Sequence, residues 1–155
     1  MREVSFTFIS RSQPADCPYR WVQAGSAAAA ASVAEAGLII TAMSSPEPIL
    51  YAEDLADGVI VLAVGAHTVD TRELATDVLA GAQVVVEDRG AAQREAGDVA
   101  LAVAERALAW DDAIELADVI RGDATLDPAR RVVFKTVGMP WEDLAVAKAL
   151  VRHTA

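Results

Sequence analysis

The stretch Val59-Ile60-Val61-Leu62-Ala63-Val64-Gly65-Ala66-His67 decides the fold of this chain. It begins with a short, uninterrupted apolar run rich in β-branched residues, which is typical of a buried strand in a parallel sheet. Gly65 then lets the backbone turn sharply or come close to a ligand. Because ligands of open α/β sheets bind beyond the carboxyl ends of the strands, His67 follows at the point where a functional site is expected.

Outward from this stretch, strand and helix patterns alternate along the chain. Strands are predicted over residues 4–9, 19–23, 38–42, 59–64, 83–86 and 131–134. Helices are predicted over residues 27–36, 72–79, 97–110, 114–120 and from Pro140 onward, the last with Leu144, Ala147, Lys148 and Val151 on one face. This alternation predicts an α/β fold with a Rossmann-like, mainly parallel sheet and helices on both faces. Residues 1–155 show no repeat, linker or boundary, so a single domain is expected.

Composition narrows the class of protein. Of the 155 residues 54% are hydrophobic and 23% charged, which is the balance of a globular domain with its own core. The formal net charge of -10 disfavours nucleic acid and anionic membranes as partners. Cys17 is the single cysteine and the two histidines lie far apart, so neither a disulfide nor a metal site is predicted. The apolar stretch 27–43 is interrupted by Glu35 and Gly37 and does not resemble a membrane span. A cytoplasmic location is expected.

One familiar element does not occur in the sequence. Dinucleotide-binding domains normally open with a strand, a Gly-x-Gly-x-x-Gly turn and a helix whose N-terminus receives the pyrophosphate. The chain contains no such turn, since Gly25 and Gly37 have the wrong spacing. The sheet is therefore expected to lack the first strand and the glycine-rich loop of that fold.

Three segments, at 39–50, 62–74 and 132–145, carry a family resemblance. They are Ile39-Ile40-Thr41-Ala42-Met43-Ser44-Ser45-Pro46-Glu47-Pro48-Ile49-Leu50, then Leu62-Ala63-Val64-Gly65-Ala66-His67 with Arg72-Glu73-Leu74, and Val132-Val133-Phe134-Lys135-Thr136-Val137-Gly138 with Glu142-Asp143-Leu144-Ala145. In order and spacing they resemble the ornithine cyclodeaminase / mu-crystallin family. The resemblance implies a nicotinamide-dependent enzyme acting on an imino or amino acid. It also implies that the chain starts at the second strand of the nucleotide domain, as a fragment, a truncated frame or a degenerate relative.

The same resemblance assigns cofactor contacts. Ser44 would lie near the nicotinamide ribose, although it could instead bond its own backbone, and Thr41 is expected to serve the core or a turn. Arg11 follows the first predicted strand, at the position where the adenosine ribose lies in this family. The cation and hydroxyls of Ser10-Arg11-Ser12 suit a 2′-phosphate, so NADP is favoured over NAD. A plain surface arginine is the alternative. The remaining implied contacts, beneath and beside the nicotinamide, are Val64, Gly65, Ala66, Thr136 and Val137.

His67 is where the chain departs from part of the family. Ornithine cyclodeaminases carry an aspartate at the matching position, whereas the imine reductases of the family do not keep it. Histidine can act as a general acid or base near neutral pH, but a polar loop residue is the favoured alternative. Thr71 matches the position of a cofactor-contacting lysine in several members, or caps a helix. Lys135 is expected to be solvent-exposed at a strand end.

These observations favour an NAD(P)-dependent cyclic imine reductase, close to the pyrroline-2-carboxylate reductases, that transfers hydride between nicotinamide and an imino or amino acid. Two alternatives stay open: ornithine cyclodeaminase activity, and a non-catalytic relative acting as a binding or oligomeric protein. The chain alone is expected to be inactive. An apolar sheet edge or face left uncovered would favour a homo-oligomer.

Overall fold

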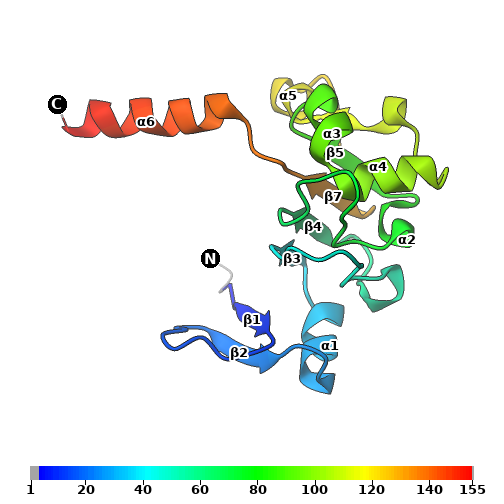
Figure 1. Ribbon diagram of the computed structural model, residues 1–155, viewed down its shortest axis with the longest axis vertical. Helices are drawn as coiled ribbons and strands as arrows, with labels where there is room; N and C mark the ends of the chain where they lie inside the picture. Colours follow the sequence, from blue (N-terminus) through cyan, green and yellow to red (C-terminus); the bar gives the residue numbers. More distant parts are fainter. Residues whose placement is uncertain (1–3, 155) are drawn as a thin grey trace.

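In residues 4–154, which the computed structural model describes, seven strands form two separate parallel sheets (Figure 1). The larger sheet has the strand order β3-β4-β7-β5-β6. Its strands are β3 (Leu38–Thr41), β4 (Ile60–Ala63), β5 (Gln83–Val86), β6 (Ile114–Glu115) and β7 (Val132–Lys135). The strand predicted at 59–64 is thus β4, and it lies between β3 and β7. The predicted Rossmann-like, parallel α/β fold is confirmed.

Helices and short 3₁₀ turns connect these strands. The helices are α1 (Ala27–Ala34), α2 (Thr76–Leu79), α3 (Arg89–Glu95), α4 (Gly97–Ala104), α5 (Leu116–Arg121) and α6 (Pro140–Thr154), and the 3₁₀ turns are η1 (Ala52–Asp54) and η2 (Trp110–Asp112). Ser26 caps α1 by accepting a hydrogen bond from the amide of Ala29, as the sequence predicts. Asp88 caps α3 in the same way through the amide of Ala91.

The core lies against one face of the larger sheet. Val61 and Ala63 of β4, Val133 of β7 and Val84 and Val86 of β5 point into it and are buried. The helices and loops over this face contribute the rest of the cluster, namely Leu50, Leu74, Ala75, Val78, Leu79, Ala92, Ala96, Val99, Ala102 and Ala113. The prevalence of alanine and valine lets short helices lie close to the strands.

The opposite face is partly open at the β3 end of the sheet. Leu38 and Ile40 of β3 are 51% and 58% exposed, and Ile60 of β4, paired with Leu38, is 42% exposed. The prediction of a fully buried central strand is therefore wrong for this face of β4. An apolar run requires cover on both sides, and on this face the described residues cover the sheet only in part: Val85 of β5 is buried and Leu62 of β4 is half-buried, whereas Ile60 is exposed. We call Leu38, Ile40 and Ile60 the open apolar patch.

The smaller sheet pairs β1 (Thr7–Ser10) with β2 (Arg20–Gln23) in parallel. It lies beyond β3 together with α1, and β1 and β3 each pair on one side only (Figure 1). The strand predicted at 4–9 is shorter and shifted toward Ser10. The division into two sheets was not predicted: no strand among residues 4–154 joins β1 to β3.

Several predicted helices have different bounds. The helix expected at 72–79 is reduced to α2, because Leu74 forms a β-bridge with Leu50 instead. The helix expected at 97–110 ends at Ala104, where Arg106 adopts a positive φ of 64°. The prediction of a helix from Ile114 is wrong for its first two residues, which pair with β5 as β6. Helix α3 was not predicted, since its short polar segment has no clear apolar periodicity.

Helix α6 begins at Pro140 as expected, with Glu142 and Asp143 in its first turn. It extends away from the sheet (Figure 1), and Leu144 and Val151 are exposed. The predicted apolar face of this helix therefore does not pack on the core.

Candidate functional site

The carboxyl ends of β3, β4 and β7 lie side by side and bring three predicted site segments to one edge of the sheet. The amide of Val64 donates to the carbonyl of Thr41 at 2.9 Å, and the amide of Thr136 donates to the carbonyl of Ala63 at 3.1 Å. These bonds continue the parallel ladder past the strand ends. Ser44, the segment 64–67 and the segment 136–137 therefore follow neighbouring strands, as sequence reasoning predicts for a site at this edge.

Gly65 is needed for close packing of two loops. A Cβ atom at this position would lie 2.3 Å from both the nitrogen and the oxygen of Met43, and 2.6 Å from Oε1 of Glu73. The two Met43 atoms belong to the backbone, so no other residue fits at position 65 without moving that backbone. The expected close approach thus exists, but in this structure its partners are the loop after β3 and a carboxylate of the protein itself.

Glu73 is the centre of this packing. Its side chain is buried, and its carboxylate accepts hydrogen bonds from the Thr41 hydroxyl at 2.9 Å and the Gly65 amide at 2.6 Å. The amide of Met43 donates to the same carboxylate. A buried charge is tolerated only when such donors replace its water. Thr41, expected in the core or a turn, is buried and serves this carboxylate.

A buried ion pair lies behind Glu73. Asp98 of α4 accepts hydrogen bonds from the amides of Glu73 and Leu74 at 2.7 and 2.9 Å. Its second oxygen lies 3.4 Å from Nζ of Lys135, and both side chains are fully buried. Burial raises the pKa of the Asp98 carboxyl, while the two amides and Lys135 oppose the rise. The expected solvent exposure of Lys135 is therefore wrong: its ammonium turns inward to Asp98 and to the carbonyl of Ala63, 3.1 Å away.

A second carboxylate holds the segment after β7. Glu87, which follows β5, accepts hydrogen bonds from the amides of Val137 and Gly138 at 3.0 and 3.1 Å. The hydroxyl of Thr136 also donates to Glu87. The Thr136 hydroxyl and the Val137 amide, which were expected to contact a cofactor, thus donate to Glu87 instead. These two residues therefore contribute the shape of their segment to the site.

His67 is exposed in the loop that follows β4, at the carboxyl ends of the strands. Its Nδ1 lies 3.0 Å from the carbonyl of Gly65. A carbonyl only accepts hydrogen bonds, so Nδ1 carries the proton and Nε2 is the nitrogen left to exchange protons with a ligand. Val64 is 44% exposed beside it, whereas Ala66 is buried.

The two remaining cofactor candidates lie on exposed loops. Ser44 follows β3 and is exposed. Arg11 follows β1 in the smaller sheet and is also exposed, next to Ser10, whose hydroxyl accepts from the indole of Trp21 at 2.9 Å. The structure thus places Ser44 at the same edge as the segments 64–67 and 136–137, and Arg11 at the end of a strand in the other sheet.

Thr71 does not cap a helix, so that prediction is wrong. Helix α2 starts five residues later, after Ala75. The carbonyls of Thr68 and Thr71 instead lie where a Cβ on Gly97 would be, at 2.3 and 2.0 Å. The loop 68–71 therefore packs directly on the first turn of α4, which also carries Asp98.

Sequence reasoning missed three carboxylates: Glu73 and Asp98, which are buried, and Glu87, which is half-buried. Glu87 was the easiest to find, because it directly follows the apolar strand Gln83–Val86. Glu73 and Asp98 lie next to apolar residues, but their burial depends on contacts between loops that are distant in sequence.

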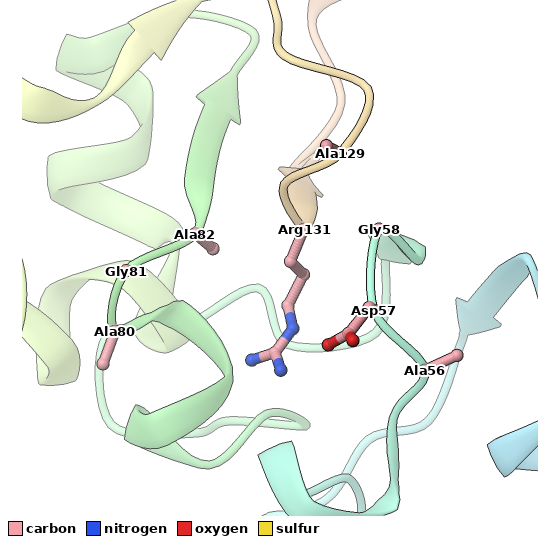
Figure 2. Close-up of a pocket in the computed structure, with 8 residues that line it drawn as sticks. All are labelled: Ala56, Asp57, Gly58, Ala80, Gly81, Ala82, Ala129 and Arg131. Carbon is pink, nitrogen blue, oxygen red and sulfur yellow. The ribbon is translucent and has the colours of Figure 1, made fainter.

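A cavity of about 180 Å³ lies at the opposite edge of the sheet. It is lined by the residues that precede β4, β5 and β7, with Asp57 and Arg131 turned toward one another in Figure 2. Because it lies at the amino ends of the strands, it is separate from the site described above. Residues 4–154 contain no cluster of metal-ligating side chains and no helix long and apolar enough to cross a membrane.

Known proteins are similar to this chain in sequence. The model of the ornithine cyclodeaminase/mu-crystallin family matches residues 10–155. Ketimine reductase mu-crystallin of Mus musculus is 39% identical over 117 residues, covering 76% of this chain and 36% of that protein. Delta(1)-pyrroline-2-carboxylate reductase 2 of Burkholderia ambifaria is 34% identical over 111 residues, covering 72% of this chain and 33% of that protein.

A solved structure extends the likeness to three dimensions. The iminosuccinate reductase of Paracoccus denitrificans in complex with NAD⁺ superposes with a TM-score of 0.74 at 27% identity, over 86% of this chain and 41% of that one. The chain thus spans about a third to two fifths of the length of these relatives. The family predicted from the three sequence segments is confirmed: this chain belongs to the ornithine cyclodeaminase/mu-crystallin family.

Proposed function

We propose that the strand-end edge formed by β3, β4 and β7 is the nicotinamide side of an NAD(P)-dependent reductase of cyclic imino acids. The observation that carries this proposal is the convergence of Ser44, the segment 64–67 and the segment 136–137 at one edge, fixed by two buried or half-buried carboxylates. Relatives named for the reduction of ketimines and pyrroline-2-carboxylate support it.

The residues at the edge fit the nicotinamide end of the cofactor. Val64 and Ser44 are exposed at this edge, and the close packing at Gly65 preorganises the loops that carry them. The cofactor, when bound, supplies the hydride, and the protein supplies orientation. The 155 residues contain no Gly-x-Gly-x-x-Gly turn, so the described edge accounts for the nicotinamide and not for the pyrophosphate.

His67 has a geometry suited to proton transfer. Because Nδ1 donates to the Gly65 carbonyl, Nε2 faces away from the loop backbone as an acceptor, or as a donor once the ring is protonated. A protonated His67 would donate a proton to a reacting imine, and the neutral ring would accept one in the reverse direction.

Arg11 supports NADP as the preferred cofactor. It is exposed at the carboxyl end of β1 beside the hydroxyls of Ser10 and Ser12, a combination that favours a 2′-phosphate. The solved iminosuccinate reductase of Paracoccus denitrificans is in complex with NAD⁺, so the cofactor preference of this chain has to be measured. A cytoplasmic location is part of the same proposal.

A second candidate function is non-catalytic self-association. The observation that favours it is the open apolar patch on β3 and β4, next to a strand edge that pairs on one side only. Such an edge and face drive association of copies.

Two measurements on the purified protein separate these functions. We expect saturable NADPH binding by fluorescence titration, with NADH weaker. Because the chain alone is expected to be inactive, we do not expect it to oxidise NADPH in the presence of Δ¹-pyrroline-2-carboxylate, and the binding supports the reductase. Release of ammonia from ornithine without imine reduction would favour cyclodeaminase activity. Absence of binding at millimolar NADPH would reject the reductase and leave the non-catalytic function.

A further inference from the structure

We propose that Glu73 is the positioning residue that sets the spacing between the loop after β3 and the loop after β4, and so prepares the surface for the nicotinamide. This inference rests on the proposed function for its consequence in cofactor affinity. The spacing between the two loops does not depend on a cofactor, and hydrogen exchange of the protein alone measures it.

The Glu73 carboxylate receives hydrogen bonds from both loops. Three groups donate to the Glu73 carboxylate: the hydroxyl at the end of β3, the amide of Met43 two residues later, and the amide of Gly65 after β4. Both amides lie beyond the last paired residues of their strands, Thr41 and Ala63. Beyond the strand ends, Glu73 therefore provides an acceptor for amides of both loops, which the hydrogen-bond ladder of the sheet does not provide.

A steric contact adds to these hydrogen bonds. The Met43 backbone lies so close to Gly65 that a Cβ atom would not fit between them, and that atom would also lie 2.6 Å from Oε1 of Glu73. The carboxylate attracts both amides, and the glycine allows them to approach. Together these two residues fix how far apart the loops lie.

Glu73 itself is held in place. Asp98 binds the backbone amide of Glu73 at 2.7 Å, and Lys135 links Asp98 to the carbonyl of Ala63. Polar contacts therefore run from β7 through α4 to Glu73 and on to the ends of β3 and β4. Among the described residues no hydrogen-bond donor reaches Oδ2 of Asp98, so the charge of Lys135 compensates this oxygen while Oδ1 holds the Glu73 amide.

The residue therefore does more than stabilise the core. A carboxylate in this location is costly to bury, and apolar residues would stabilise a core at lower cost. Its contacts go to the two loops that carry Ser44 and His67. A positioning role predicts local consequences there, whereas a purely stabilising role predicts loss of stability throughout the sheet.

The test compares Glu73→Gln with Glu95→Gln, a matched change at an exposed glutamate of α3. Met43 donates to Oε1 and Gly65 to Oε2, so the NH₂ group of glutamine replaces the acceptor of one of these two amides. We expect hydrogen exchange at that amide to accelerate about tenfold to a hundredfold, the range for an unsatisfied buried hydrogen bond. Exchange at Val61 and Val133 should stay unchanged, and NADPH affinity should fall about tenfold or more.

Thr41→Val provides the test if Glu73→Gln does not fold, because it removes one donor and keeps the shape. Its expected effect is faster exchange at the same two amides, with the rest of the sheet unaffected. Unchanged exchange at both amides, or equal acceleration throughout the sheet, would overturn the positioning role. Altered amides with unchanged NADPH affinity would overturn its link to the cofactor. If the unmodified protein does not bind NADPH, the proposed function fails, while the exchange data still decide the spacing.

Discussion

Nζ of Lys135 lies 3.4 Å from Oδ2 of Asp98, and neither side chain is exposed to solvent. This pair joins the end of β7 to the first turn of α4. Burial raises the pKa of Asp98 above its ordinary value of 3.8, and Lys135 and two amides limit the rise. The fold therefore buries an ion pair at the end of β7, where the sequence pattern predicts that Lys135 is exposed to solvent.

Replacing the lysine with methionine should destabilise the protein. Lys135→Met leaves the Asp98 carboxylate buried without its cation, which typically costs about 3–5 kcal/mol of unfolding free energy. Urea unfolding measures this loss. The double variant Lys135→Met/Asp98→Asn should recover part of it, because the uncompensated charge is gone. A single variant as stable as the unmodified protein would show that the pair does not interact.

The same pair predicts a pH dependence. Because the folded Asp98 pKa is raised, the folded state binds more protons than the unfolded chain between pH 3.8 and the raised value. This carboxyl's contribution to stability therefore decreases as pH rises through that window and is constant above it. Lys135→Met raises the pKa further and widens the window toward neutral pH. Urea unfolding of both proteins across the window, with Asp98→Asn as the control that removes the titration, measures the difference.

Two glycines should tolerate no side chain. Gly65→Ala and Gly97→Ala place a Cβ within 2.3 Å of backbone atoms of Met43 and of Thr68 and Thr71, respectively. We expect each to lower the unfolding free energy by about 1–3 kcal/mol, the usual cost of overpacking. Gly37→Ala is the matched control, since no atom lies within 4 Å of a Cβ there. Equal stability of all three variants would contradict the packing described at the site.

Glu87 should order the segment after β7. Glu87→Ala removes both carboxylate oxygens, and with them the acceptor of the amides of Val137 and Gly138 and of the Thr136 hydroxyl. We expect a loss of about 1–3 kcal/mol for the unsatisfied groups and faster amide exchange at residues 137 and 138. Val85, in the strand before Glu87, should keep its exchange rate. Unchanged exchange at 137 and 138 would mean that the ladder alone holds this segment.

The open apolar patch should cause self-association. Ile40→Lys places a charge in the patch and beside the β3 edge, so the sedimentation coefficient should become less dependent on protein concentration. Ile120→Lys is the control, because Ile120 is 76% exposed on α5, away from β3 and β4. An unmodified protein that sediments as a monomer at high concentration would contradict this prediction.

The sequence predicted the fold well where local pattern and tertiary environment agree. The apolar runs at β4, β5 and β7 are strands because β-branched residues favour them and neighbours cover at least one face. The same pattern does not reveal which face is covered, so the exposure of Ile60 was not predicted. The helix expected at 72–79 is short because Asp98 binds the amides of Glu73 and Leu74, a contact between segments 25 residues apart.

The rule that ligands bind beyond parallel strand ends led us to segments that do lie at one edge of the sheet, and their role as a site stays a prediction. The buried side chains that support these segments were not predicted. Lys135 was expected in water because lysines at strand ends are usually exposed. Its burial depends on Asp98, whose own burial depends on the loop 68–71 packing on Gly97. Such mutual dependence cannot be found from one residue and its neighbours in sequence.

The most direct test of the account is an NADPH titration followed by the amide NMR signals of the protein. The account predicts that signals of Ser44, Gly65 and Ala66 shift together and saturate, with smaller changes for NADH. No shift at millimolar NADPH would contradict it. So would shifts confined to Asp57, Gly58 and Gly81 at the opposite edge of the sheet.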